Sequence, residues 1–246
     1  SRSDVGMPGT AVIMGAGDAL GGAIARRFAR EGLIAVPSRR KIMPLGELVA
    51  EIEDDGCLAE GIPCDARDEE AVINLFDKVE NEIGPLEAFV FNTGAQHSDS
   101  ILDMTAKIYR QVWESAAFAG FLTGREAARR MVDRGRGTVI FTGATASVRG
   151  GPGFASFAGA KHALRALAQS MARELGPKGI HVGHIIVDGM IDSDAVRNKF
   201  PDRTAALPAG GMLNPDHIAD SYWGMHAQPR DAWTFEMDLR PSVEQW

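Results

Sequence analysis

The sequence predicts an α/β fold, a doubly wound parallel sheet of seven strands with helices on both faces. Short apolar runs rich in Val, Ile and Phe alternate along the chain with longer stretches of helical periodicity, which is typical of successive βα units. A glycine-rich turn directly follows the first apolar run. The chain has 246 residues, 45% of them hydrophobic, and no internal repeat or linker divides it, so we expect one sizeable core.

Seven segments are expected to form the strands, and the longer periodic segments between them the helices. The region 188–214, with Pro201, Pro208, Gly210 and Gly211, has no regular periodicity, so we expect a lid or binding loop there. The predicted strands are residues 10–15, 33–38, 58–63, 86–92, 137–142, 180–187 and 233–239. The predicted helices are residues 20–32, 44–56, 68–83, 104–134, 154–176 and 215–227.

Composition and charge exclude several classes of protein. The 33 acidic side chains outnumber the 26 basic ones and give a net charge of −7, which argues against a broad nucleic-acid or membrane surface. No apolar stretch approaches the roughly 18 residues of a membrane span. Cys57 and Cys64 have no metal-ligand spacing, so we expect reduced thiols and no metal site. A cytoplasmic protein that acts on a small molecule is therefore expected.

The first predicted strand runs through a glycine-rich turn straight into a helix. Glycines let the backbone approach a pyrophosphate closely, and the N–H groups at the helix N-terminus attract its charge. A tight turn without a ligand is the alternative, but the strand, turn and helix setting favours phosphate binding. The residues predicted to bind a dinucleotide here are Gly15, Gly17, Asp18, Ala19, Leu20 and Gly21.

The end of the second predicted strand indicates which dinucleotide is bound. An acidic residue at this place would bind the ribose 2′-hydroxyl of NAD, whereas this chain has Ser38, Arg39 and Arg40. Guanidinium groups suit a 2′-phosphate, so NADP(H) is preferred over NAD(H); a solvated arginine pair is the alternative. Asp65, followed by Ala66, either accepts a hydrogen bond from the adenine amino group or stabilises a turn.

The glycine turn, Asp65, the run Phe91-Asn92-Thr93-Gly94 and Lys161 together resemble the short-chain dehydrogenase/reductase family over nearly the whole chain. The turn is similar to the family's T-G-x-x-x-G-x-G motif, and Asn92 to Gly94 match part of its N-N-A-G motif. The resemblance implies a Rossmann-like sheet, usually in a homo-oligomer, a tetramer or a dimer. It also implies cofactor contacts from Asn92, Thr93 and Gly94, and binding of the nicotinamide ribose by Lys161; an exposed helix lysine is the alternative.

The same resemblance exposes a departure at the active site. The family uses a tyrosine, a lysine, a serine and an asparagine, but this chain has Phe157, Ala144 and Ala117 at the tyrosine, serine and asparagine positions and retains Lys161. A phenyl ring has no proton to give, and alanine has no hydrogen-bonding side chain. The usual proton-transfer route is therefore missing.

Four other side chains are candidates for replacing the missing groups. Thr142, Thr145 and Ser147 lie at the end of the fifth predicted strand, where doubly wound folds gather ligand groups; the alternative is an ordinary turn role. His97 lies in the loop after the fourth predicted strand and is of a residue type suited to acid–base chemistry. A surface histidine is the simpler explanation of His97.

These observations favour an NADP(H)-dependent oxidoreductase acting on a small carbonyl or alcohol by an atypical proton route, through Lys161 or a water. A non-catalytic dinucleotide-binding sensor or partner protein is the alternative, because the catalytic groups are missing. A Rossmann-like methyltransferase ranks last, since it leaves the Arg39-Arg40 pair and Asn92 unexplained. We assign residues 7–246 to one dinucleotide-binding domain and treat residues 1–6 as a candidate leader segment.

Overall fold

The computed structural model describes residues 6–17, 19–94 and 96–246, and its framework is a parallel sheet. The strand order is β2-β1-β3-β4-β5-β6, and each neighbouring pair is parallel. The chain therefore adds β2 on one side of β1 and the strands from β3 onward on the other side. This is the doubly wound α/β architecture that the sequence predicts. The strands are β1 (Thr10–Met14), β2 (Ile34–Ser38), β3 (Leu86–Phe91), β4 (Gly137–Ala144), β5 (Ile180–Val187) and β6 (Glu236–Leu239).

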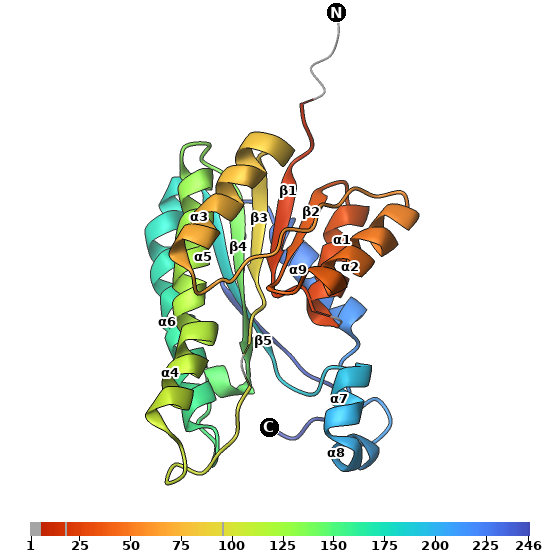
Figure 1. Cartoon of the computed structure of the whole chain (residues 1–246), viewed down its shortest axis with the longest axis vertical. Helices are drawn as coiled ribbons and strands as arrows, with labels where there is room; N and C mark the ends of the chain where they lie inside the picture. Colours follow the sequence, from red (N-terminus) through yellow and green to blue (C-terminus); the bar gives the residue numbers. More distant parts are fainter. Residues whose placement is uncertain (1–5, 18, 95) are drawn as a thin grey trace, which may run out of the picture.

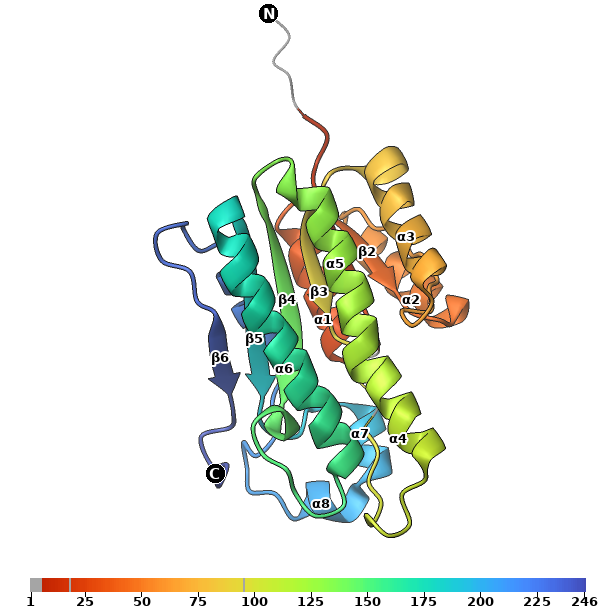
Figure 2. The ribbon, with the colours of Figure 1, turned by 90° about the vertical axis from the view of Figure 1, so that its left-hand side faces the viewer.

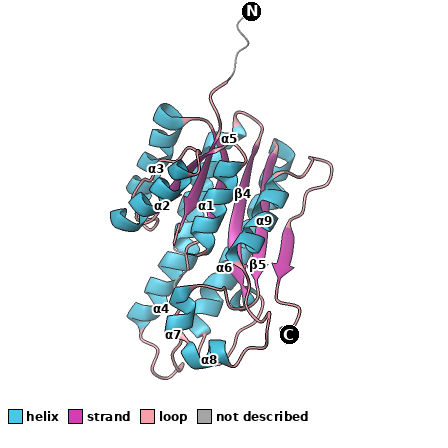
Figure 3. Ribbon diagram, turned by 90° about the vertical axis from the view of Figure 1, so that its right-hand side faces the viewer, coloured by secondary structure: helices cyan, strands magenta, loops and turns pink. Residues whose placement is uncertain are grey.

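Helices cover both faces of the sheet (Figures 1, 2 and 3). Alternate residues of β1 point to opposite faces, so that Val12 and Met14 belong to one buried cluster and Ala11 and Ile13 to the other,. In the described ranges, no helix is both long and apolar enough to cross a membrane. One face carries α3 (Glu69–Lys78), α5 (Ala119–Val132) and α6 (Ala155–Leu175), and the other α1 (Leu20–Arg30), α2 (Ile42–Asp54) and α9 (Pro215–His226).

The segment predicted as a further strand, residues 58–63, is an extended edge segment, so the sheet formed by the described residues has six strands and not seven. It lies beside β2 and forms only an isolated bridge, at Ala35. The amide of Ile62 donates to the carbonyl oxygen of Pro37, but Pro37 has no N–H with which to continue the ladder. The Ser38 hydroxyl donates to the Ile62 carbonyl at 2.6 Å and holds the segment in place.

The helix predicted over residues 104–134 is divided by a π-helical turn. It comprises α4 (Ala106–Trp113), the π segment η2 (Glu114–Phe118) and α5. A second π segment, η1 (Val79–Ile83), extends α3. A π turn inserts one residue into the helix and changes the direction of the side chains around it. Ser115, which lies in η2, and Ala119, the first residue of α5, both line a cavity at the end of the sheet.

The region predicted as a lid or binding loop, residues 188–214, contains two short helices, α7 (Asp194–Lys199) and α8 (Pro201–Ala205). Both lie beyond the carboxyl end of β5 (Figures 1 and 3). The Ser193 hydroxyl accepts a hydrogen bond from the Val196 amide and caps α7,. A bridge between Ile191 and Leu213 closes the base of the region. This region therefore forms an ordered wall over the edge of the sheet where ligands bind in such folds.

Candidate functional site

Two neighbouring cavities open at the carboxyl ends of the strands. The first, of about 550 Å³, extends over residues 39–41 and 64–67. The second, of about 910 Å³, extends over the ends of β4 and β5 and the region 188–214. Among the described residues, four line both cavities: Gly15, Gly17, Asn92 and Gly94. A single elongated ligand that crosses this shared boundary could occupy both.

The glycines of the first turn have different structural roles. Gly15 has a φ of 85°, in the left-handed region that favours glycine. A Cβ added at Gly21 would lie 2.4 Å from the Gly15 carbonyl oxygen, so α1 and the turn are in backbone contact there. A Cβ added at Gly17 would meet no described atom within 4 Å. Gly17 thus presents open backbone to both cavities.

The amino end of α1 faces the second cavity, which Ala19, Leu20 and Gly21 line. Ala19 is the N-cap and makes no side-chain capping bond, and the first turn of α1 has no acidic residue. The positive end of the helix dipole is therefore not neutralised by its own first turn. Asp18, predicted to belong to this binding turn, lies outside the described residues.

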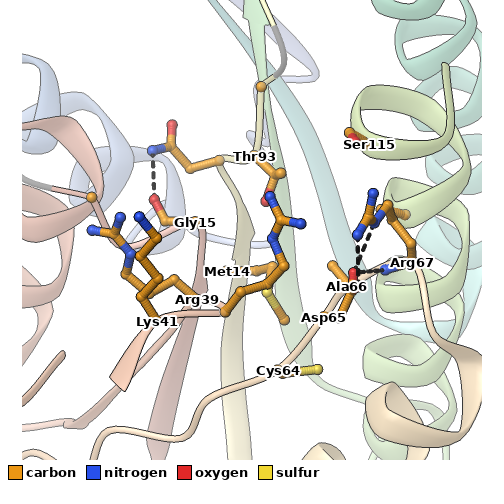
Figure 4. A pocket seen from close by; sticks show the side chains of 15 residues that line it. Met14, Gly15, Arg39, Lys41, Cys64, Asp65, Ala66, Arg67, Thr93 and Ser115 are labelled. Carbon is orange, nitrogen blue, oxygen red and sulfur yellow. Dashed lines mark hydrogen bonds and ion pairs between the residues drawn. The ribbon is translucent and has the colours of Figure 1, made fainter. Parts of the chain in front are cut away.

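The end of β3 is tied to the glycine turn through Asn92. The Asn92 amide donates to Met14 O at 2.8 Å, and its Nδ2 donates to the Gly15 carbonyl oxygen at 3.3 Å. Thr93 and Gly94 continue along the wall of the first cavity, where Figure 4 labels Gly15 and Thr93. The structure thus brings together the turn and the Asn92–Gly94 run that the sequence analysis assigned to one cofactor.

Cationic side chains gather around the first cavity. Arg39 and Arg40 line it, as predicted, together with Lys41 and Arg67, which the sequence analysis did not select. Figure 4 shows Arg39, Lys41 and Arg67 in place around the cavity. Ser38 does not line the cavity: its side chain is fully buried and its carbonyl oxygen accepts from the Gly15 amide at 2.9 Å. Ser38 supports the turn from beneath.

Asp65 stabilises a turn at the far wall of the first cavity. Its Oδ1 accepts from the backbone amide of Arg67 at 3.0 Å, and its two oxygens accept from Arg67 Nε and Nη2 at 2.9 and 2.8 Å (Figure 4). These side-chain hydrogen bonds lower the pKa of the Asp65 carboxyl. The structure therefore contains the turn role that the sequence analysis weighed. Ala66 also lines this wall and contributes only a methyl group to it.

The described residues contain no group of three or more His, Cys, Asp or Glu side chains placed to hold a metal ion. Cys57 and Cys64 are free cysteines. Cys64 lines the first cavity, but its burial raises the pKa of the thiol to about 11. Because a thiol must ionise to act as a strong nucleophile or metal ligand, Cys64 serves here as a small neutral wall.

Lys161 lies buried in the second cavity, with an exposed fraction of 4%, so the alternative of an exposed helix lysine is wrong. Its Nζ donates to the Thr142 carbonyl oxygen at 3.0 Å and lies 5.8 Å from the centroid of the Phe157 ring. Burial lowers the pKa of the ammonium to about 8. A proton can therefore leave this group close to neutral pH.

The other matched positions carry no polar side chain. Ala144 lines the second cavity, while Ala117 is buried in a cluster with Phe157 and Ala160. Phe157 itself lines the cavity and is 9% exposed. At these positions the surroundings of Lys161 are therefore apolar. They lack the hydrogen bonds that a hydroxyl or amide side chain would supply there.

The three candidate hydroxyls are each engaged inside the protein. The Thr142 hydroxyl hydrogen-bonds to the fully buried Tyr222 hydroxyl. The Ser147 hydroxyl accepts from the Ala144 amide at 3.0 Å, and Ser147 lines neither cavity. The Thr145 hydroxyl donates to the Asp188 carboxylate, and both residues line the second cavity. Thr145 is therefore the candidate whose oxygen remains placed to accept a bond from a ligand.

His97 does not take part in this arrangement. It lines neither the first nor the second cavity, and its Nε2 lies 3.8 Å from Asp99 Oδ2. The backbone two residues after His97 is bonded to the loop that precedes α6, since the Asp99 amide donates to the Gly153 carbonyl oxygen at 2.8 Å. The structure thus places His97 outside the lining of both cavities.

A protein-family model supports this interpretation of the fold and the glycine turn. The model described as short chain dehydrogenase matches residues 9–204. This range includes the glycine turn that lines both cavities, Lys161 and most of the region 188–214. The chain therefore belongs to the short-chain dehydrogenase/reductase family, a family of oxidoreductases.

Curated relatives cover most of the chain. The 3-oxoacyl-[acyl-carrier-protein] reductase MabA of Mycobacterium avium is 30% identical over 202 residues, which are 80% of this chain and 74% of that protein. The 1-cyclohexenylcarbonyl-CoA reductase of Streptomyces collinus is 30% identical over 204 residues, 82% of this chain and 71% of that one. Both names describe reductases.

Solved structures share the whole fold. A short-chain dehydrogenase from Rhodopseudomonas palustris is 44% identical, with a TM-score of 0.83 over 95% of this chain and 98% of that one. The actinorhodin polyketide ketoreductase with NADPH has a TM-score of 0.88 at 21% identity, over 97% and 98% of the two chains. The second likeness shows the fold alone.

Proposed function

We propose that the protein is a cytoplasmic, NADP(H)-dependent oxidoreductase that moves hydride to or from a small carbonyl or alcohol by an atypical proton route. One observation carries the proposal: the buried Lys161 ammonium lies in the second cavity, which adjoins both the glycine turn and the first cavity with its cationic side chains. Titration with NADPH and NADH, followed by turnover assays with aldehydes, ketones and quinones, tests it. If neither nucleotide binds, the proposal fails.

The residues present fit such a cofactor. Open backbone at Gly17 and the uncapped amino end of α1 suit a pyrophosphate,. Arg40 and Lys41 suit a 2′-phosphate, and Asp65 and Ala66 form the wall for adenine,. Asn92, Thr93, Gly94 and Lys161 would hold the nicotinamide end. The polyketide ketoreductase named above contains NADPH, and a metagenomic short-chain oxidoreductase of the same fold contains NADP.

Replacing Arg40 with glutamine should weaken NADPH binding about tenfold and leave NADH binding unchanged, because a charge-assisted bond to the 2′-phosphate is lost. Lys41→Gln should act in the same direction. Fluorescence titration with each nucleotide gives the dissociation constants. Arg30→Gln is the control, since Arg30 is exposed at the end of α1 and lines neither cavity. Equal loss for both nucleotides would contradict the phosphate assignment.

The chemistry divides between cofactor and protein. When bound, the nicotinamide supplies or accepts the hydride. Lys161 holds a proton at Nζ beside the apolar wall of Phe157, and a pKa of about 8 lets it give that proton to a substrate oxygen near neutral pH. The bond from Nζ to the Thr142 carbonyl oxygen fixes the ammonium and leaves its other protons for ribose and substrate.

Changing Phe157 to tyrosine should raise kcat/KM for carbonyl reduction about tenfold. The new hydroxyl would enter the same cavity as a second proton donor, and the nearby ammonium would favour its ionised form. Phe154→Tyr is the matched control, because Phe154 also lines this cavity but is not at the matched position. An equal gain in both variants would show that any added hydroxyl suffices.

A non-catalytic dinucleotide-binding sensor or partner protein is the second candidate. The absence of polar side chains at Phe157, Ala144 and Ala117 favours it. Tight NADPH binding without turnover of any carbonyl would support this candidate over the enzyme.

We also propose a homo-oligomer, a dimer or a tetramer. Exposed aromatic residues on α4 and α5 support self-association: Tyr109 is 43% exposed, Trp113 42% and Phe121 39%. Large exposed apolar patches of this kind are typical of protein interfaces.

A further inference from the structure

Two arginines line the second cavity without an acidic partner in the described part of the chain. Arg149 follows the short helix η3 (Thr145–Ser147), and Arg203 lies in α8. Both side chains are exposed. The guanidinium of Arg203 lies 5.4 Å from the centroid of the Phe200 ring, and no ion pair of described residues includes either arginine. Their charges are thus available to a ligand in the cavity.

The acidic residues of this cavity do not cancel these charges. The Asp188 carboxylate accepts from the Thr145 hydroxyl and forms an ion pair with Arg240 Nε at 3.1 Å. Glu244, half-buried near the end of the chain, is the other carboxylate among the described lining residues. The cationic lining residues are Arg149, Arg203 and Lys161. Among the described lining residues the cationic side chains thus outnumber the carboxylates, in a chain with a net charge of −7, and this surplus favours an anionic ligand.

The remaining lining residues indicate where a ligand would carry its polar, apolar and charged parts. Phe154, Phe157, Met190 and Leu207 give the cavity an apolar surface. Lys161 is buried, whereas the two arginines are exposed. A ligand with a polar reacting carbon at the buried end, a short apolar body and a negative charge at the open end would match all three regions.

We propose that the substrate is a small oxo or hydroxy compound bearing a carboxylate, which Arg149 and Arg203 bind while its reacting oxygen lies at Lys161. The planar guanidinium forms paired, charge-assisted bonds with a carboxylate. This assignment rests on the proposed function, because it takes the second cavity as the reaction site. It specifies the class of substrate, which the fold alone leaves open.

Calorimetric titration of the NADP⁺-saturated protein tests the proposal without requiring turnover. The probes are 4-oxopentanoate and 2-oxohexanoate, each compared with its methyl ester, which has the same oxo group but no charge. The wild type should bind at least one acid about tenfold more tightly than its ester. Raising the salt concentration to about 0.5 M should reduce this preference, since exposed charges are screened.

The variants Arg149→Gln and Arg203→Gln should each lose most of the preference for the acid and keep the wild-type affinity for NADPH. Arg30→Gln, at a distant exposed arginine, should keep both. Equal binding of acids and esters, binding of neither, or a preference that survives both substitutions would overturn the proposal. Failure of NADPH to bind would instead overturn the proposed function, so the two failures are distinguishable.

Discussion

Replacement of Lys161 by methionine should lower kcat for NADPH-dependent carbonyl reduction about 100-fold or more, measured at saturating NADPH. Methionine keeps the apolar stem in the buried site but removes the proton donor, and general acid catalysis contributes about 10²-fold to 10⁴-fold. Affinity for NADPH should fall as well, because the same ammonium is expected to bind the nicotinamide ribose. Saturation separates the two effects. Unchanged kcat with a raised KM would limit Lys161 to binding.

The pH profile gives an independent measurement of the same role. Donation requires the ammonium, and burial lowers its pKa to about 8. The rate of reduction should therefore be constant at lower pH and fall as the pH rises through about 8, whereas oxidation of the alcohol should rise over this range. Lys161→Met should remove this transition. Lys178→Met, at an exposed lysine of η4 (Gly176–Lys178), should keep the wild-type profile.

Two alanine substitutions in the glycine turn should differ in their effect on stability, although both should weaken NADPH binding. Gly21→Ala should destabilise the fold by about 2 kcal/mol or more and abolish tight NADPH binding, because the new Cβ would lie 2.4 Å from the Gly15 carbonyl oxygen and 2.7 Å from Ala16 Cα. Gly17→Ala should leave stability unchanged, since its Cβ has open space, yet weaken NADPH binding about tenfold by obstructing close approach of the pyrophosphate.

Urea unfolding and nucleotide titration of both variants measure these effects. Gly46→Ala is a useful control, because Gly46 lies within α2 and its Cβ would meet nothing within 4 Å. That substitution should stabilise the protein by up to about 1 kcal/mol, as alanine favours a helix. Wild-type stability and affinity in Gly21→Ala would contradict the close contact between α1 and the turn.

The sequence predicted the fold class and selected most of the described residues that line the first cavity, because both depend on local patterns. Alternating apolar runs and helical periods identify β1 to β5, and the strand, turn and helix sequence identifies Gly15 to Gly21. Arg39 and Arg40 follow from their place after the second strand. In a doubly wound sheet, the ends of neighbouring parallel strands necessarily meet at one edge, so residues far apart in sequence could be assigned to one site.

Features that depend on long-range packing were not predictable from such patterns. The π turn in residues 114–118 has the same apolar periodicity as the helix around it. The burial of Lys161 depends on β4, whose Thr142 carbonyl oxygen accepts a hydrogen bond from the Lys161 ammonium. Arg67 could have been noticed from its spacing to Asp65, which allows a turn with a paired side chain. Arg149 and Arg203 line one cavity only because α8 lies beyond the carboxyl ends of the strands.

The interrupted ladder at Pro37 has a consequence for the wall of the first cavity. The edge segment that follows residue 58 leads directly to Cys64 and Asp65, which line the first cavity. Pro37 cannot donate a hydrogen bond to this segment, so backbone bonds on either side of Pro37 and the bond from the Ser38 hydroxyl to the Ile62 carbonyl oxygen hold it against β2,. The wall of the first cavity at Cys64 and Asp65 therefore depends on these few hydrogen bonds at the sheet edge and not on a continuous strand ladder.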